Sequence, residues 1–210
     1  MAIFTTYTNE RSMVAARIKK AFDSVIELDL VVWENFSKLG TVEHFSAETV
    51  LKPSGTREKQ FSLLLSGIGG ALIWRKKQYI CTDLYVENDC VMDYLSFTLQ
   101  SVTDTEIRLF EASSVFRIPY QRFQETFNPN AYGPAVTLKS LERAYMDKLR
   151  QQVDLLSRTA KERYLDVCER HKDVDRIPLK YMASYLGITP QSLSRIRSEK
   201  IDQLPYGNSH

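Results

Sequence analysis

RIPLKYMASYLGITPQSLSRIRSEK, residues 176–200, has the pattern of two short helices joined at a glycine. Pro178 suits the first turn of the first helix, where its missing N–H leaves no hydrogen bond unmade. Gly187 can adopt the left-handed conformation that ends this helix. Thr189 then caps the second helix and Pro190 opens it. We therefore predict a helical hairpin of the kind that is typical of a DNA-reading helix-turn-helix.

Apolar residues at three- and four-residue spacing give both helices a side to bury. These residues are Met182, Ala183, Leu186, Ile188, Leu193 and Ile196. At about 100° per residue, burial of Leu193 and Ile196 turns the polar side of the second helix outward. The predicted DNA contacts on that side are Gln191, Arg195 and Ser198, with Ser192 and Ser194 beside them.

The chemistry of this polar side matches what the major groove of DNA presents. Arginine can bind the O6 and N7 atoms of guanine, glutamine can pair with adenine, and small hydroxyl residues allow close approach. The alternative is a surface hairpin whose polar side only faces water. Charge favours DNA, because residues 138–210 hold 14 Lys and Arg against 10 Asp and Glu, a net charge of +4. Residues 1–137 hold 14 against 16, a net charge of −2, so the positive excess lies beside the hairpin.

Composition bounds the class of protein. The 210 residues are 43% hydrophobic and 26% charged, which is ordinary for a soluble globular chain with a buried core. No run approaches the roughly 20 apolar residues that span a bilayer, and the first ten residues do not resemble a signal peptide. We therefore expect a cytoplasmic protein with no membrane contact.

Catalytic and metal-binding patterns are missing from the sequence. The three cysteines, Cys81, Cys90 and Cys168, are widely spaced and form no C-x-x-C pair. The three histidines, His44, His171 and His210, are also far apart in the sequence. Residues 66–70, SGIGG, lack the Lys-Ser/Thr of a phosphate loop and are predicted as a tight turn between strands. We therefore expect no enzyme, no cofactor and no metal, and we rank an enzyme built on the barrel last, since it would need a cluster of ligands on strands.

The order of elements follows from the periodicity of apolar residues. Residues 13–39 predict two helices, and short apolar runs between Thr41 and Phe123 predict strands of an antiparallel sandwich or barrel. The runs cover residues 42–45, 49–51, 61–65, 71–74, 79–86, 107–110 and 115–118. Residues 127–134, FNPNAYGP, form a breaker cluster. A further helix over about residues 158–170 carries Tyr164, Leu165, Val167 and Cys168, which we expect to support the hairpin.

A long helix follows the breaker cluster and carries one apolar stripe. The stripe consists of Leu138, Leu141, Tyr145, Leu149, Val153 and Leu156. Over about five turns it resembles the seam that one helix presents to another, which predicts a homodimer. The alternative is that the stripe packs only against its own barrel.

This arrangement resembles the Crp/Fnr family of bacterial transcription regulators over nearly the whole chain. The most specific stretch is residues 181–197, YMASYLGITPQSLSRIR, which looks especially like divergent members found in Bacteroidetes. Residues 51–53, 64–67 and 116–123 match the first turn of the family's barrel, its strand-ending glycine and its closing strand. The resemblance implies a homodimer whose barrel senses a signal that the long helices transmit to the DNA-reading hairpin, with RNA polymerase as a further partner.

The resemblance also suggests where an effector would bind. In members that bind a cyclic nucleotide, a Gly-Glu-Leu segment holds the ribose and an arginine about ten residues later neutralises the phosphate. The corresponding residues here are Met92, Asp93, Tyr94, Thr103, Asp104 and Thr105. Asp93 keeps the acid, but Met92 replaces the glycine, Thr103 replaces the arginine, and Asp104 would repel an anion. We therefore predict an altered pocket, with an unknown small-molecule effector if any, and no response to cyclic AMP in the usual mode.

The family's winged hairpin would follow the second helix, and residues 201–210 are too few for two strands with a core contact, so we expect no full wing. Backbone contacts would then fall to the helix itself, with Thr189, Arg197 and Lys200 as predicted phosphate partners. Arg197 and Lys200 lie nearer the core-facing side, so their stems could instead pack along Leu193.

The predicted fold class is α+β, with an N-terminal antiparallel β-barrel or jelly roll of the cyclic nucleotide-binding-like type. Residues 1–137 form the sensor barrel and its helices, residues 138–157 the dimerisation helix, and residues 158–210 a helix-turn-helix domain without a full wing. The predicted function is a homodimeric, sequence-specific transcription regulator that binds double-stranded DNA. The alternative is a small-molecule-binding barrel whose C-terminal hairpin serves protein contacts.

Overall fold

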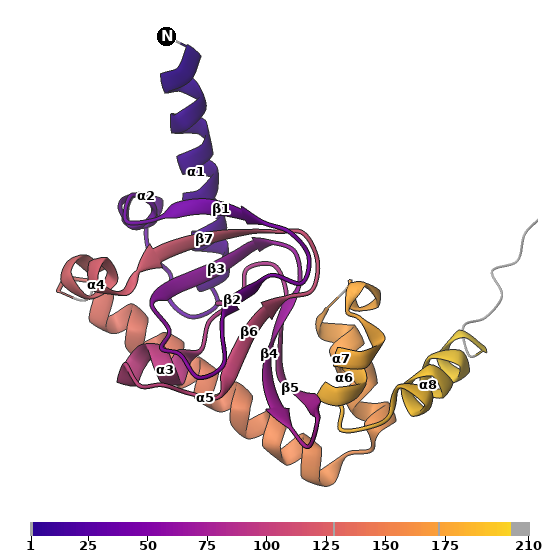
Figure 1. Ribbon diagram of the computed structural model, residues 1–210. Helices are drawn as coiled ribbons and strands as arrows, with labels where there is room; N and C mark the ends of the chain where they lie inside the picture. Colours follow the sequence, from indigo (N-terminus) through magenta and orange to yellow (C-terminus); the bar gives the residue numbers. More distant parts are fainter. Residues whose placement is uncertain (1, 128, 172, 203–210) are drawn as a thin grey trace, which may run out of the picture.

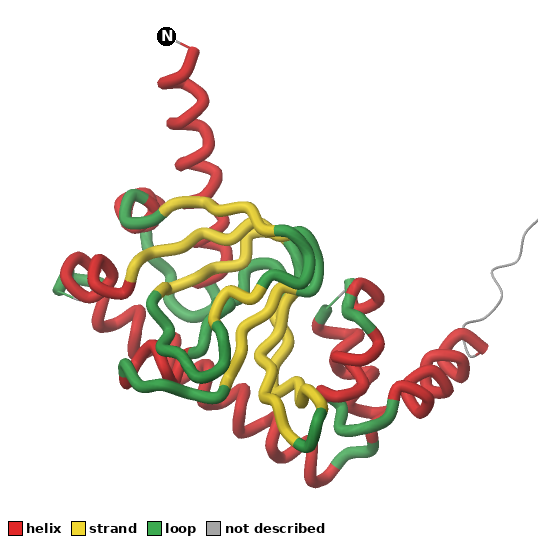
Figure 2. Tube along the Cα trace, viewed as in Figure 1, coloured by secondary structure: helices red, strands yellow, loops and turns green. Residues whose placement is uncertain are grey.

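The computed structural model describes residues 2–127, 129–171 and 173–202, and the side chains of residues 12–127, 129–171 and 173–199. The chain is α+β, with two antiparallel sheets and helices before and after them (Figures 1 and 2). One sheet has three strands in the order β1-β7-β3, and the other has four in the order β2-β6-β4-β5. The strands are β1 (Thr41–Phe45), β2 (Val50–Lys52), β3 (Gln60–Ser66), β4 (Gly69–Arg75), β5 (Gln78–Tyr85), β6 (Thr105–Leu109) and β7 (Ser113–Pro119).

Each of the seven apolar runs predicted as strands is a strand, with ends that move by at most two residues. Two kinds of burial explain this agreement. In β6 the buried residues alternate, at Ile107 and Leu109, whereas in β3 the residues Phe61–Leu65 are buried without interruption, and both patterns give short apolar runs in the sequence. Leu64, Ile107 and Val115 come from three different strands and are all fully buried in one cluster between the sheets.

Residues 66–70 are not the single tight turn that we predicted. Only Gly67 and Ile68 lie between β3 and β4, and these strands belong to different sheets. Gly67 has a φ of +110°, a conformation that favours glycine. Gly70 lies inside β4, where an added Cβ would come within 2.6 Å of the Phe110 ring. The glycines therefore allow a corner between two sheets and a close approach within one of them.

Two N-terminal helices cover one end of the three-stranded sheet, α1 (Ala2–Phe22) and α2 (Leu30–Ser37). Two helices were predicted here, but α1 begins well before residue 13, because its first half lacks the apolar periodicity that reveals a helix. The fully buried Trp33 stacks on Phe22 at 5.1 Å, and Phe36 packs edge-on against Phe61 of β3. These aromatic contacts fix the helices to the sheet.

The long helix α5 (Gly133–Ser157) begins five residues earlier than the predicted start at residue 138. Pro134 lies in its first turn, where proline is tolerated, so the end of the breaker cluster is in fact the start of the helix. The Asn130 side-chain oxygen accepts hydrogen bonds from the backbone N–H groups of Tyr132 and Gly133, at 2.9 and 2.6 Å. The short helix α3 (Tyr94–Leu99) lies between β5 and β6. Two further short helices, α4 (Tyr120–Arg122) and η1 (Phe123–Phe127), lie between β7 and α5.

Three helices and a short turn complete the described chain: α6 (Ala160–Arg170), η2 (Val174–Arg176), α7 (Leu179–Tyr185) and α8 (Pro190–Asp202). Thr159 and Glu162 form a capping box that starts α6. Of the four α6 residues predicted to support the hairpin, Tyr164 and Val167 are buried in one cluster with residues of α7 and α8, and Cys168 packs against it. Leu165 is half-buried and does not belong to this cluster. Within the described ranges, no helix is both long enough and apolar enough to cross a membrane.

The same cluster includes residues of the four-stranded sheet, so the C-terminal helices share a core with the barrel. Tyr181 of α7 stacks on Phe110 with ring centroids 4.0 Å apart. The Ser184 hydroxyl accepts a hydrogen bond from the Cys81 backbone N–H of β5 at 2.9 Å. Arg176 forms ion pairs with Glu87 and Glu111, which lie on loops of the barrel. These contacts hold the C-terminal helices against the barrel, and α7 lies beside β5 (Figure 1).

Candidate DNA-contacting helix and the polar site of the barrel

The α7–α8 hairpin has the local geometry expected from its sequence. Gly187 has a φ of +68°, Pro190 opens α8, and Leu193 is fully buried while Ile196 is half-buried. The Thr189 hydroxyl accepts a hydrogen bond from the backbone N–H of Ser192 at 3.1 Å and so caps the helix. Pro178 is one residue out of the predicted position, because it precedes α7 instead of lying within it.

Burial of Leu193 leaves a polar side of α8 in solvent. Gln191, Ser194, Arg195 and Ser198 are exposed and Ser192 is half-buried. The Ser198 hydroxyl donates to the Ser194 carbonyl at 3.1 Å. Gln191 and Arg195 make no side-chain hydrogen bond or ion pair with any residue that the structure describes. Their donors are therefore available to a partner molecule.

The three predicted phosphate partners differ in their surroundings. Thr189 is exposed, but its hydroxyl is already engaged in the helix cap. Arg197 is half-buried, with its guanidinium 5.7 Å from the centroid of the Tyr164 ring. This inward position matches the alternative in which its stem packs on the core. The side chain of Lys200 and residues 203–210, where a wing would be sought, lie outside the described part of the chain.

The apolar stripe of α5 is exposed along its whole length. Its six residues, Leu138, Leu141, Tyr145, Leu149, Val153 and Leu156, are between 38% and 84% exposed. A different side of α5 faces the barrel, where Lys148 pairs with Asp83 at 2.7 Å and Gln151 donates to the Thr82 carbonyl at 3.3 Å. The alternative in which the stripe packs against its own barrel is therefore wrong.

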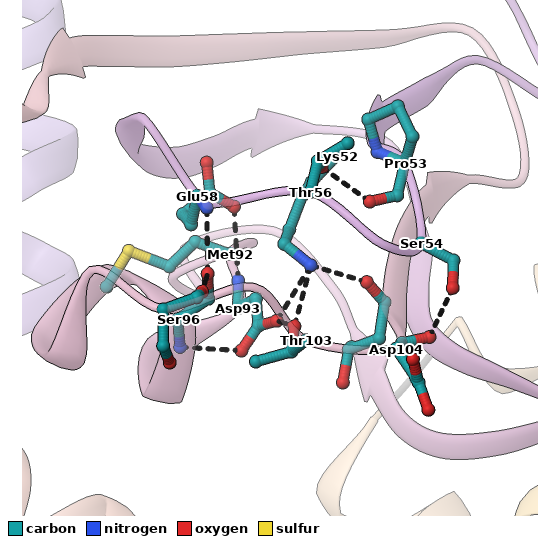
Figure 3. A network of polar contacts seen from close by, with 12 residues as sticks. Lys52, Pro53, Ser54, Thr56, Glu58, Met92, Asp93, Ser96, Thr103 and Asp104 are labelled. Carbon is teal, nitrogen blue, oxygen red and sulfur yellow. Dashed lines mark hydrogen bonds and ion pairs between the residues drawn. The ribbon is translucent and has the colours of Figure 1, made fainter.

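A buried ion pair occupies the barrel at the predicted effector site. Figure 3 shows the Lys52 side chain of β2 pointing between Asp93 and Thr103. Its ammonium lies 3.0 Å from the Asp93 carboxylate and donates to the Thr103 hydroxyl at 2.8 Å and the Thr105 carbonyl at 2.6 Å. The Lys52 side chain is 1% exposed and that of Asp93 is 5% exposed. All three donors of the ammonium are therefore satisfied inside the protein.

Asp93 and Glu58 connect this ion pair to helix α3. The Asp93 carboxylate caps α3 by accepting from the Ser96 backbone N–H at 3.1 Å, and it also accepts from the Thr103 hydroxyl. The Glu58 carboxylate accepts from the Asp93 backbone N–H at 3.2 Å. Burial raises the pKa of Glu58 above its usual value, although the backbone N–H groups that donate to it act in the opposite direction.

The six predicted pocket residues do not line one surface. Asp93, Thr103 and the Thr105 carbonyl meet at Lys52, whereas Met92 is buried in the N-terminal core and Tyr94 packs beside that core. Asp104 is exposed and pairs with Arg75 at 2.7 Å, so the prediction that its charge repels an anion inside the site is wrong.

Lys52 is a member of the site that the sequence did not predict. Residues 51–53 were interpreted only as a turn, although a lysine at an inward-facing strand position requires a charged partner. Thr103 stands in place of the arginine, as predicted, but the site still contains a cation. The cation is present, and Asp93 neutralises it.

Comparison with known proteins identifies the fold. No family model matches this sequence, and no curated protein matches it either. A putative cAMP-binding regulatory protein from Silicibacter pomeroyi DSS-3 has a TM-score of 0.64 and 12% identity, covering 91% of this chain and 88% of that one. FixK2 from Bradyrhizobium japonicum has a TM-score of 0.64 and 13% identity, covering 81% of this chain and 89% of that one. The c-di-GMP-responsive global regulator CLP from Xanthomonas campestris has a TM-score of 0.61 and 14% identity, covering 86% of this chain and 96% of that one.

These identities are low, so the similarity establishes the fold alone. The chain has the cyclic nucleotide-binding-like fold found in Crp/Fnr-type regulators, which here consists of the two sheets, the long helix α5 and the C-terminal helices. Two of these three proteins, CLP and the Silicibacter pomeroyi protein, are described as regulators.

Proposed function

We propose that this chain is a homodimeric, sequence-specific DNA-binding transcription regulator of the Crp/Fnr type. The observation that supports it best is the state of α8: Leu193 is fully buried, while Gln191 and Arg195 are exposed and free of partners among the described residues. A helix that presents an arginine and a glutamine on one solvent face can bind base edges in the major groove. Ser192, Ser194 and Ser198 lie beside them.

The exposed stripe of α5 supports the dimer. Six apolar residues at helical spacing face away from the contacts that Lys148 and Gln151 make with the barrel. A second copy of α5 would remove this stripe from water and place two α8 helices in one assembly. The positive charge of residues 138–210 is modest, so one copy would bind DNA weakly. Two copies that each bind a half-site would bind more tightly than one. In this proposal residues 1–137 form the sensor domain, residues 138–157 form the dimer contact and residues 158–210 bind DNA. The protein acts in the cytoplasm, with RNA polymerase as a further partner.

The Lys52–Asp93 ion pair supports the second part of the proposal, which is that cyclic AMP does not act in the usual mode. That mode needs an acid free to bind a ribose hydroxyl and a cation free to bind a phosphate. Here Asp93 already accepts from Ser96, Thr103 and Lys52, and the Lys52 ammonium is fully engaged. A ligand would have to break a buried ion pair in order to enter, which costs several kcal/mol.

The central residue of the proposed DNA contact is Arg195, and a shift assay with a salt titration tests it. Replacing Arg195→Ala should cost about 1–3 kcal/mol in binding to a selected duplex and relax specificity at one base step. Arg150→Ala is the matched control, because it removes the same charge from an exposed arginine that belongs to α5 and not to α8. DNA affinity of the parent should fall steeply with salt. Salt-independent binding, or none, would instead favour the barrel sensor whose hairpin serves protein contacts.

A further inference from the structure

The β4–β5 hairpin ends in an exposed tip that the proposed function does not yet use. Arg75 pairs with Gln78 across the hairpin, which leaves Lys76 and Lys77 as its two-residue loop. All of residues 74–78 are exposed, and Trp74 is 51% exposed. A large aromatic ring and two lysines in solvent make this tip unlike the buried strands that lead to it.

The backbone of the tip is strained. Lys76 and Lys77 have φ values of +50° and +65°, in the left-handed region that disfavours residues with a side chain. Two-residue hairpin loops of this kind are normally built from Asn-Gly or Asp-Gly, which adopt positive φ with little cost. Two consecutive lysines here lower the stability of the fold. Backbone strain of this type is characteristic of sites with a function.

The charges of the tip are available to a partner. Arg75 is neutralised by Asp104 at 2.7 Å. Lys76 and Lys77, by contrast, make no hydrogen bond or ion pair with the part of the chain that the structure describes. The tip therefore presents two uncompensated positive charges at the surface.

The tip is attached to the end of α7 that leads into α8. The Ser184 hydroxyl donates to the Tyr79 carbonyl at 3.4 Å, and it accepts from the Cys81 backbone N–H at 2.9 Å. Tyr79 also packs against the core of the C-terminal helices. Lys77 is two residues from Tyr79, so about 7 Å of strand separates the lysines from this contact. Ser184 is followed three residues later by Gly187, where the chain turns into α8.

We propose that the β4–β5 hairpin is a second DNA-contacting element, in which Lys76 and Lys77 bind phosphate groups beside the segment that α8 reads. This inference rests on the proposed function and extends it to the sensor barrel. Lysine ammonium groups on a projecting hairpin can bind phosphates without reading bases. The barrel then adds affinity that is independent of sequence, while α8 supplies the specificity.

A variant that relieves the strain and removes the charge tests this inference. In Lys76→Asn/Lys77→Gly the loop has the preferred residues, so we expect a higher Tm together with about tenfold weaker binding to a selected duplex. The slope of log affinity against log salt should become shallower by about 2, one for each lost phosphate contact. Lys76→Arg/Lys77→Arg should retain affinity. Lys19→Ala/Lys20→Ala at the end of α1 removes the same charge and should change neither affinity nor slope.

Trp74 gives an independent readout of where the duplex lies. The chain has two tryptophans, and Trp33 is fully buried, so acrylamide quenches Trp74 first. Specific duplex should reduce that quenching in the parent protein. The parent protein must first bind DNA with the expected salt dependence. If Lys76→Asn/Lys77→Gly then binds equally well, or if Trp74 stays as accessible with DNA as without it, the proposed role of the hairpin is contradicted while the proposed function stands.

Reduced transcription with unchanged DNA affinity would assign the tip to a protein partner, and this result would also contradict the proposed DNA contact. A parent that binds no DNA contradicts the proposed function itself.

Discussion

At the scale of single residues, Lys52 decides the chemistry of the barrel site. Its ammonium is buried beside Asp93 and donates to Thr103 and to the Thr105 carbonyl. A buried charge without a partner is costly, whereas this pair satisfies itself within the protein. The predicted effector site therefore holds a structural ion pair, and its buried cation is not free to bind a phosphate.

This ion pair predicts a large and non-additive loss of stability. Lys52→Met should lower the free energy of unfolding by about 3–5 kcal/mol, because it leaves the Asp93 carboxylate buried without a counter-charge. Lys52→Met/Asp93→Asn should lose less than the sum of the two single variants, and a double-mutant cycle in urea measures the difference.

The exposed pair Lys139–Glu142 provides the comparison, at a similar distance of 2.9 Å. Lys139→Met should change stability by no more than about 0.5 kcal/mol, as is usual for a surface pair. Equal effects of Lys52→Met and Lys139→Met would mean that Lys52 is not paired in a buried site.

The sequence predicted the residues of this site only in part. Asp93 and Thr103 were predicted because they match the cyclic nucleotide-binding segments of the family that the sequence resembles. Lys52 was not found, because it comes from a strand about 40 residues earlier and sequence spacing does not reveal which strands pair. Asp104 was misplaced for the same reason, since its partner Arg75 belongs to another strand.

At the scale of elements, α5 carries the feature that sequence periodicity predicted best. Its stripe was visible as apolar residues three and four positions apart, and the structure places these residues in solvent. The start of the helix was missed because residues 133–137 begin with Gly-Pro, which looks like a loop until its position in the first helical turn is known. Strands were predicted well for a similar reason, since a short apolar or alternating run is a local signal.

Interruption of the stripe should abolish pairing. Leu149→Glu places a charge in the middle of the stripe, and we expect a dimer of the parent to become a monomer in sedimentation equilibrium. Leu155→Glu is the matched control, because it changes the same residue type on α5 about 120° around the helix. Pairing through α5 is contradicted if Leu149→Glu sediments like the parent.

At the scale of the whole molecule, the barrel and the C-terminal helices share one core. Phe110 stacks on Tyr181, and Arg176 pairs with Glu87 and Glu111, across more than 60 residues of sequence. Contacts between residues so far apart produce no pattern in the local sequence. The sequence therefore predicted a separate C-terminal unit but not the contacts that attach it to the barrel. The contacts hold α7 against the barrel, and Leu193 of α8 is buried in the same cluster, so we expect the spacing of two α8 helices in a dimer to be well defined.

Selection from a library of random duplexes tests the central claim most directly, which is that two copies of α8 read two half-sites. The account predicts that an inverted repeat is enriched, with half-site centres about 10 base pairs apart or a multiple of that distance, and that two chains bind each duplex. Moving one half-site by about 5 base pairs should reduce binding to the non-specific level, since it places the two half-sites on opposite faces of the DNA. An enriched single half-site bound by one chain, or no enriched sequence, would contradict it.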